Sequence, residues 1–296
     1  MAGTTHFFAH GKLLLTSEYT VLHGAWALAV PTQKGQHLTH HPGTAPLTWE
    51  ARDCQGEIWL SGEVASAPEL HWVRTSMEAA LRLAGRSEWP TGHVETVLEF
   101  EREWGWGSSS TLTSLMAQWM GVDPMALHFA VSQGSGYDVA CAQASGAILY
   151  RRRGNTCEVH RVSMEHWPSQ ALYLAYLGQK RDSQAAVKSY AAHDDRAAAH
   201  TTQLTVDLLE ASSPEQWASY LLAHEQFMAD HLGAESPVLP HYASPSSARA
   251  HAGGKSLGAW GGDFALFCDP NPDTLAYLHD CGYAPVFPWK EVVLHV

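Results

Sequence analysis

The chain has 296 residues, of which 45% are hydrophobic and 16% charged, and 12 of them are tryptophan. This composition excludes a mainly disordered or low-complexity chain, and the length suffices for about two domains with their own cores. The formal net charge of −12 would repel a phosphate backbone, so nucleic acid is not an expected partner.

The cysteines and the apolar segments bear on the compartment. The five cysteines are scattered and form no Cys-x-x-Cys pair, as in proteins of a reducing compartment. Residues 1–15 lack the basic stretch and apolar core of a signal peptide. No window approaches the roughly 18 uninterrupted apolar residues that a membrane-spanning helix needs. We therefore expect a cytoplasmic protein with no membrane partner.

Short runs in the first third of the chain predict strands followed by a helix. The strands are expected at residues 36–40, 47–53 and 57–60, because Pro-Gly and Cys-Gln-Gly turn signals separate these runs. Apolar residues then recur at three- and four-residue spacing over 70–84, with Gly85 as a stop. This spacing predicts a helix packed on the sheet.

A glycine- and serine-rich segment, Gly105–Ser110, lies between a predicted strand at 93–100 and a predicted helix that begins near Thr111. Glycines let the backbone approach a ligand closely, and the free N–H groups of a helix start bind anions. The order therefore favours a phosphate-binding loop, although it matches neither the P-loop nor Gly-x-Gly-x-x-Gly. A flexible turn with an N-cap serine is the alternative.

The second half is predicted to be α+β, because helices alternate with strands. A shift toward helix formers near Trp167 indicates a domain boundary. The expected elements are a buried strand at 172–178, helical segments to about Leu232, helix starts at Ser213-Pro214 and Asn271-Pro272, and strands at 264–268 and 292–296.

Three further segments contain candidate functional residues. Lys12 precedes an apolar triplet, with Glu18 after it, and a lysine here can also be a strand-edge residue that reaches solvent. Asp138 follows a Gly-Ser-Gly turn, where a helix cap is the alternative. The glycines of 253–262, with Asp263 after them, precede a predicted strand and indicate tight bends or a surface against a substrate or phosphate.

In this order, these segments resemble the motifs of the GHMP kinases, the superfamily of galactokinase, homoserine kinase, mevalonate kinase and phosphomevalonate kinase. The first motif is similar to Gly11–Tyr19, the phosphate loop to Gly105–Ser110 and the third motif to Lys255–Asp263. The segment Gln133–Ala140, which contains Gly-Tyr-Asp-Val-Ala, resembles the mevalonate-pathway branch.

The resemblance implies an α+β, two-domain GHMP kinase fold with ATP and Mg²⁺ as cofactors. Residues 1–165 would be the ATP-binding N-terminal domain, of the ribosomal protein S5 domain 2-like type. Residues 166–296 would be a ferredoxin-like C-terminal domain. A homodimer is one assembly that the resemblance allows.

The resemblance also assigns roles to single residues. Asp138 matches the catalytic aspartate and Lys12 the lysine that pairs with it, and a carboxylate kept ionised by a lysine can take the proton of an acceptor hydroxyl. The implied ATP-phosphate ligands are Gly105, Gly107, Ser108, Ser109 and Ser110, with Ser109 as the Mg²⁺ ligand. The implied substrate-binding residues are Glu18, Lys180, Arg181, Ser183, Lys188, Gly261 and Gly262.

The sequence departs from the family pattern at several positions. Glu101 stands where a proline usually precedes the phosphate loop, Ser17 replaces a glycine of the first motif, and Trp260 lies among the glycines of the third. Many relatives hold the metal with a glutamate about ten residues before the catalytic aspartate, which this sequence lacks; Mg²⁺ would then rest mainly on substrate phosphates and water.

We expect an ATP-dependent small-molecule kinase of the mevalonate (isoprenoid) pathway that phosphorylates phosphomevalonate or mevalonate. Lys180, Arg181 and Lys188 suit a substrate with carboxylate and phosphate groups, which favours phosphomevalonate, although they are also compatible with a solvated helix start. Mevalonate kinase proper or another GHMP hydroxyl kinase is the alternative.

Two other classes of function stay open. The 19 histidines suggest a metal-dependent phosphohydrolase as one alternative. Neither of their clusters, however, has clear further metal ligands elsewhere in the chain at matching spacing. These clusters are His37, His40 and His41, and His193, Asp194 and Asp195 with His200. The departures from the family motifs suggest the other alternative, a homologue that binds nucleotide but does not catalyse phosphoryl transfer.

Overall fold

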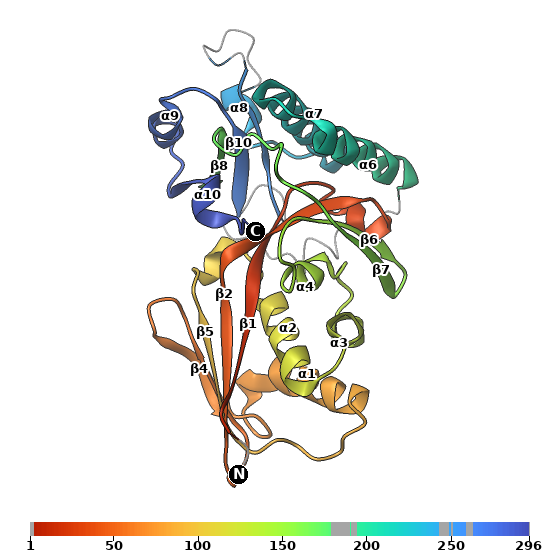
Figure 1. Cartoon of the computed structure of the whole chain (residues 1–296), viewed down its shortest axis with the longest axis vertical. Coiled ribbons are helices and arrows are strands. Elements are labelled where there is room, and N and C mark those ends of the chain that lie inside the picture. The colour runs from red at the N-terminus through yellow and green to blue at the C-terminus, as the bar shows by residue number, and fades with distance from the viewer. Residues whose placement is uncertain are drawn as a thin grey trace. The chain divides into compact units, whose positions relative to one another are not determined.

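The structure is a computed structural model that describes residues 3–178, 190, 194–242, 249, 251–258 and 263–295. The chain packs into two compact units, each built from separated segments (Figure 1). Unit 1 contains residues 1–12, 34–102 and 106–144, and unit 2 contains residues 13–33, 103–105 and 145–296. The units therefore do not divide the chain at one point near residue 165, and the two expected family domains stay a prediction.

Unit 1 contains a mainly antiparallel sheet, in which β3 and β5 form a parallel pair. Its strands are β1 (Thr5–Leu14), β2 (Ala27–Pro42), β3 (Thr48–Arg52), β4 (Ile58–Glu63) and β5 (Gly92–Leu98), with β1 and β2 continuing into unit 2. The order is β4-β3-β5-β2, with β1 also paired to β2. The register from Gln36↔Leu98 to Pro42↔Gly92 buries Leu38 and Val94 on the same face.

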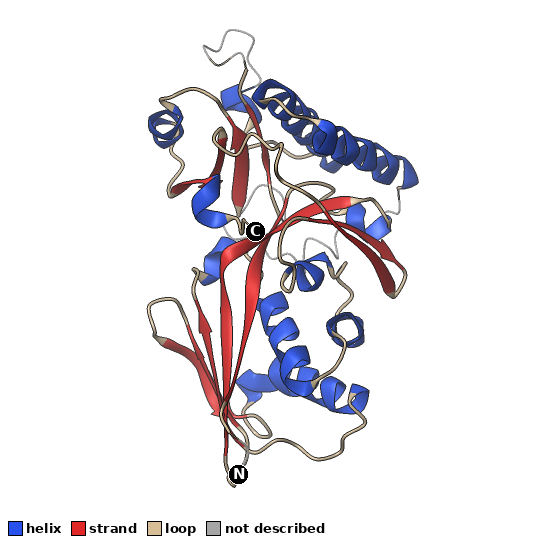
Figure 2. Cartoon of the chain, viewed as in Figure 1, coloured by secondary structure: helices blue, strands red, loops and turns tan. Residues whose placement is uncertain are grey.

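The helices of unit 1 cover this buried face (Figure 2). They are α1 (His71–Leu83), α2 (Ser108–Met120), α3 (Pro124–Val131) and α4 (Tyr137–Cys141). Met77 of α1 and Leu115 of α2 pack in one core with Leu38 and Trp49. The predicted strands and the helix over 70–84 are confirmed, with small boundary shifts except at β2, which begins nine residues before the predicted strand at 36–40. The helix expected near Thr111 begins three residues earlier, at Ser108.

Unit 2 contains a hairpin, a four-stranded antiparallel sheet and several helices. The hairpin of β6 (Ile148–Arg153) and β7 (Thr156–Arg161) pairs with the start of β2 through Ala27↔Tyr150. The sheet has the order β11-β8-β10-β9, with β8 (Leu172–Tyr176), β9 (Gly253–Ser256), β10 (Phe264–Cys268) and β11 (Val286–Pro288). The helices are α6 (Asp195–Glu210), α7 (Pro214–Leu232), α8 (Leu239–Tyr242), α9 (Thr274–Asp280) and α10 (Trp289–Val292).

Two helix starts had been predicted in this half, and one is placed correctly. At α7, Ser213 and Gln216 form a complete capping box. α9 begins at Thr274 and not directly after Asn271, because the Asn271 backbone and side-chain amides both donate to Asp269 Oδ1 (3.0 and 2.6 Å). The predicted capping role of Asn271 is therefore wrong.

The strand expected at 292–296 is also wrong. α10 occupies the chain up to Val292, and Val293 makes only an isolated bridge to Thr32. Apolar β-branched residues at this position thus pack behind a short helix instead of extending a sheet. In the described part of the chain, no helix is both long and apolar enough to cross a membrane.

Candidate active site

α2 begins after a tight turn at Gly107. Gly107 has a φ of 92°, in the left-handed region that favours glycine, and a β-carbon there would lie 2.5 Å from Ser110 Oγ. The first helical hydrogen bond runs from the Thr111 N–H to the Gly107 carbonyl (2.9 Å). The N–H groups of residues 108–110 therefore have no acceptor within the helix, as in an anion-binding helix start.

The serines of this loop differ in what their side chains do. Ser110 is buried, and its hydroxyl donates to the Gly107 carbonyl (2.9 Å). Its side chain thus closes the turn, and only its backbone N–H belongs to the set of helix-start donors. Ser109 is exposed and Ser108 half-buried. Ser109 is therefore the loop serine whose hydroxyl is most accessible to a ligand.

Lys12 lies beside this turn. Its backbone N–H donates to the Trp106 carbonyl (2.9 Å), which joins β1 to the residue before Gly107. Its Cε would lie 3.1 Å from a β-carbon on Gly107, and its Nζ is 5.6 Å from the centre of the Tyr137 ring. The lysine side chain is thus packed between the start of α2 and the start of α4.

Asp138 lies in the first turn of α4, after Gly136, whose φ is 86°. Its Oδ1 accepts a hydrogen bond from the Val139 N–H (3.0 Å), and the residue is half-buried. Burial raises the pKa of the Cys141 thiol well above its usual range, and there Lys12 lowers and Asp138 raises that pKa. The Lys12 and Asp138 charges therefore both act on the Cys141 thiol. No sequence pattern indicates that this cysteine lies near them.

Unit 2 contains the residues around Glu18. The Glu18 carboxylate is wholly buried and forms an ion pair with Lys255, which is equally buried. Burial raises the pKa of Glu18, and Lys255 opposes that shift. The carboxylate expected to bind substrate is therefore directed at a protein cation, and its substrate-binding role stays a prediction.

A second contact within unit 2 joins the phosphate loop to the third motif. A β-carbon on Gly105, whose φ is 67°, would lie 2.2 Å from Asp263 Oδ2. The preceding residue, Trp104, packs edge-on against Phe264 and Phe287, with ring centres 5.9 and 5.3 Å away. Asp263 therefore fixes the first glycine of the loop, a role that sequence reasoning missed.

Comparison with solved structures gives close agreement in fold at low sequence identity. Phosphomevalonate kinase of Streptococcus pneumoniae, in complex with phosphomevalonate and AMPPNP, superimposes with a TM-score of 0.72 over 99% of this chain and 98% of its own, at 17% identity. Mevalonate kinase of Methanococcus jannaschii superimposes with a TM-score of 0.70 over 100% and 99% of the two chains, at 9% identity. Galactokinase of Lactococcus lactis, in complex with galactose, gives 0.65 over 94% and 89%, at 13% identity.

The chain has the fold of the GHMP kinases. No family model matches its sequence, and no curated sequence is significantly similar to it. The expected fold class is thus confirmed by the structure. The predicted roles of single residues stay predictions.

Several predicted site residues of this GHMP kinase fold lie outside the described residues. They are Lys180, Arg181, Ser183, Lys188, Gly261 and Gly262. Those that the structure describes fall into two groups. Lys12, Asp138 and the loop from Gly107 lie in unit 1, whereas Glu18 and Gly105 lie in unit 2.

Two histidines of the predicted clusters have structural contacts, whereas His193 lies outside the described residues. His37 Nε2 lies 3.0 Å from a Glu99 carboxylate oxygen, and the His200 ring packs on Phe227 with centres 4.3 Å apart. Among the described residues, no group of three or more metal-ligating side chains is assembled. These contacts give the metal-dependent phosphohydrolase no support.

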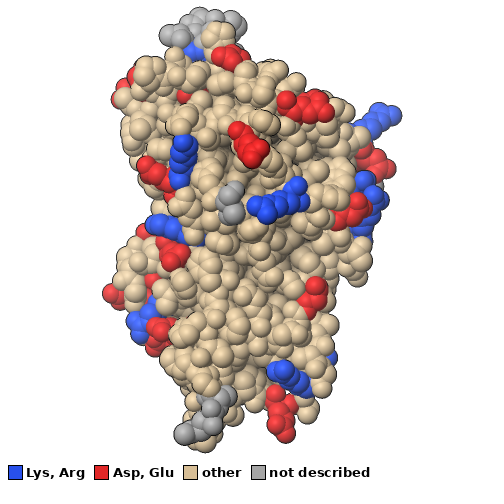
Figure 3. Space-filling view, in the orientation of Figure 1, with Lys and Arg blue, Asp and Glu red and all other residues tan. Residues whose placement is uncertain are grey.

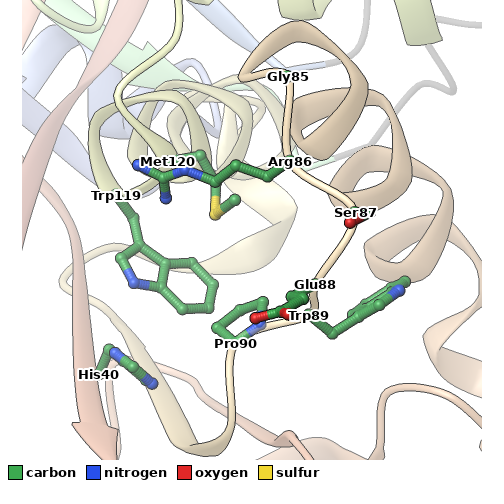
Figure 4. Close-up of a pocket in the computed structure, with 9 residues that line it drawn as sticks. All are labelled: His40, Gly85, Arg86, Ser87, Glu88, Trp89, Pro90, Trp119 and Met120. Carbon is green, nitrogen blue, oxygen red and sulfur yellow. The ribbon is translucent and has the colours of Figure 1, made fainter.

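A surface pocket of about 520 Å³ lies in unit 1, at the C-terminal end of α2 (Figure 4). Trp119 and Met120 of that helix line it together with His40 and the 85–90 loop. It contains none of the predicted site residues, because the phosphate loop is at the opposite end of α2. On the face shown in Figure 3, basic side chains are scattered among acidic ones and form no extended basic patch.

The buried His224, on α7, gives a testable pH dependence. Its Nε2 accepts a hydrogen bond from the Ser17 N–H (2.9 Å); burial, with Lys255 adding to it, lowers the pKa of His224 well below 6.5. Below that pH the unfolded chain binds a proton that the folded chain does not. The free energy of unfolding should therefore fall as the pH falls, by up to about 1.4 kcal/mol per pH unit.

The measurement is chemical denaturation of the wild type and His224→Gln between pH 7.5 and 5.5, since glutamine retains an acceptor for Ser17. The stability difference between the two proteins should shrink as the pH falls. A constant difference at position 224 would contradict the neutral, buried state of that histidine.

Proposed function

We propose that this protein is an ATP-dependent small-molecule kinase of the GHMP type that acts on phosphomevalonate, with mevalonate as the alternative acceptor. The observation that carries the proposal is that β1, the start of α2 and the start of α4 bring Lys12, the helix-start N–H groups and Asp138 together within unit 1. The solved complex of phosphomevalonate kinase with phosphomevalonate and AMPPNP supports it, because that chain has the same fold over its whole length.

The chemistry of these groups suits phosphoryl transfer, in which alignment and charge stabilisation do most of the work. The N–H groups of residues 108–110 and the positive end of α2 would bind the ATP phosphates. The Lys12 cation would offset negative charge on the transferred group. Asp138 would accept the proton of an acceptor hydroxyl.

The loop fits a nucleotide phosphate for a steric reason. A β-carbon at Gly107 would lie 2.5 Å from Ser110 Oγ and 3.1 Å from Lys12 Cε, so glycine is the residue that leaves both side chains, and the helix-start N–H groups beside them, in place. For Mg²⁺, the oxygen donors in this part of unit 1 that are not fully buried include the Ser109 hydroxyl and the Asp138 carboxylate. These residues would hold Mg²⁺, which would supply positive charge to neutralise that of the ATP phosphates.

The first prediction concerns Gly107. Gly107→Val should lower ATP affinity at least tenfold, because its side chain would clash with Ser110 and Lys12 where the phosphates must bind. Gly121→Val is the matched control: Gly121 ends α2 with a similar positive φ (69°), and a β-carbon there meets nothing within 4 Å. Calorimetric titration with a non-hydrolysable ATP analogue measures both. Equal affinity in the two variants would reject the assigned phosphate site.

The second prediction separates the two acceptors. Asp138→Asn should lower kcat on a hydroxyl acceptor by roughly two to four orders of magnitude, with ATP affinity nearly unchanged. The loss should be small on phosphomevalonate, since a phosphomonoester is already an anionic nucleophile near neutral pH. Asp123→Asn is the control, because Asp123 only caps α3 through the Ala126 N–H (2.6 Å). Release of ADP, followed in a coupled assay, reports the rates.

The third prediction concerns the acceptor phosphate. Arg181→Ala and Lys188→Ala should each raise the KM for phosphomevalonate about ten- to hundredfold and leave the KM for ATP unchanged, because each removes a charge-assisted hydrogen bond. Arg86→Ala, at the far end of α2, is the control. Wild-type KM values in both test variants, or much faster turnover of mevalonate, would favour the hydroxyl kinase. ATP binding without ADP release on any acceptor would indicate the non-catalytic homologue.

A further inference from the structure

Two buried carboxylates determine where the third motif begins. Lys255 and Ser256 form the end of β9, and the Lys255 ammonium donates to Glu18 and to the Ser256 carbonyl (2.6 Å). Glu225, on α7, accepts hydrogen bonds from both the N–H and the hydroxyl of Ser256 (2.8 Å each). All of these residues are buried, so water does not compete for the contacts. The end of β9 is thus fixed on two sides by charge.

The chain around Glu18 is strained in a way that supports this geometry. Ser17 and Tyr19, on either side of Glu18, have φ values of 64° and 61°, which residues with a β-carbon rarely adopt. The strained turn is held by the Ser17 N–H donating to His224 and by the Ser17 hydroxyl donating to the Trp26 carbonyl (2.7 Å). The turn directs the Glu18 side chain into the interior, where it meets Lys255. Strain that surrounding contacts maintain at a motif is a reason to look for function there.

The other end of the third motif touches the phosphate loop. The Leu257 N–H donates to the Phe264 carbonyl (2.8 Å), which joins the residue after β9 to the first residue of β10. Asp263 then lies against the α-carbon of Gly105. Within unit 2, the third motif is therefore bound to the first motif at Lys255 and to the phosphate loop at Asp263.

We propose that Lys255 is a positioning residue: through its ion pair with Glu18 it sets the third motif, and with it the Gly105 end of the phosphate loop. The proposal rests on the proposed function for its catalytic consequence, but not for its structural one. A buried ion pair is about as stable as a neutral pair of similar size, so stability alone gives no reason to keep it. Phosphoryl transfer does give one, since a displacement of about 1 Å at a reacting group can cost a hundredfold in rate.

The test separates position from stability. Lys255→Met alone leaves the Glu18 charge buried without its partner, and the unfolding midpoint should fall clearly. The double variant Glu18→Gln with Lys255→Met removes both charges, and its midpoint should return close to that of the wild type. Its kcat should nevertheless stay at least tenfold below wild type, because the reacting groups are misplaced.

The matched control is a second buried ion pair of unit 2, Arg249 with Asp269, which lies beside α9. The double variant Arg249→Met with Asp269→Asn should have wild-type kcat. If the Glu18 and Lys255 double variant regains both the wild-type midpoint and the wild-type kcat, the pair is only structural and the proposal is overturned.

Amide hydrogen exchange gives a result that does not depend on turnover. In the double variant, the amides of Ser256, Leu257 and Gly105 should exchange at least tenfold faster than in the wild type, whereas those of α6 should be unchanged. If the wild type transfers no phosphate, the proposed function fails but this comparison still decides whether Lys255 sets the loop. Unchanged exchange at Gly105 in the folded double variant would overturn the proposal.

Discussion

The candidate site depends on how closely β1 approaches the start of α2. The hydrogen bond from the Lys12 N–H to the Trp106 carbonyl brings the strand against the loop, and the contact leaves no room for a β-carbon at Gly107. A glycine with positive φ is needed there for both reasons, steric and conformational. The same approach places the lysine side chain next to the start of α2, which is preceded by two glycines with positive φ, Gly105 and Gly107.

The buried charges of unit 2 show a different kind of constraint. Glu18, Lys255, Glu225 and His224 lie within one hydrogen-bonded region away from water. Burial raises the pKa of Glu18 and lowers that of His224, so for each group the environment disfavours the charged form. Such a cluster is costly to desolvate, and its benefit is a unique geometry more than a gain in stability.

Local features of the sequence could be predicted where the signal is itself local. The helix over 70–84 and the capping box at Ser213 depend on residues a few positions apart, and both appear in the structure. The strand expected at 292–296 failed because the chain it meets, around Thr32, lies more than 250 positions away and forms one isolated bridge with it, at Val293. The apolar residues of this segment are compatible with both a strand and a short helix, so composition alone did not distinguish the two.

The candidate site shows the same limit. Lys12, Asp138 and the glycine-rich loop could be found because motif order along the chain identifies them. The contacts that fix the motifs could not: Lys255 and Glu18 are 237 positions apart, and neither has a sequence pattern that indicates the other. A lysine in a strand is most often a surface residue, so only the fold shows that this one is buried.

One departure from the family pattern, at Ser17, is offset by contacts of its side chain. Ser17 stands where the first motif has a glycine, and it keeps the left-handed conformation that a glycine would adopt. Its side chain then makes hydrogen bonds that glycine has no atoms to make, to the Trp26 carbonyl and toward Thr205. These bonds, of about 1 kcal/mol each, are of the same order as the strain of a left-handed serine. A motif position can therefore lose its glycine while the backbone geometry persists.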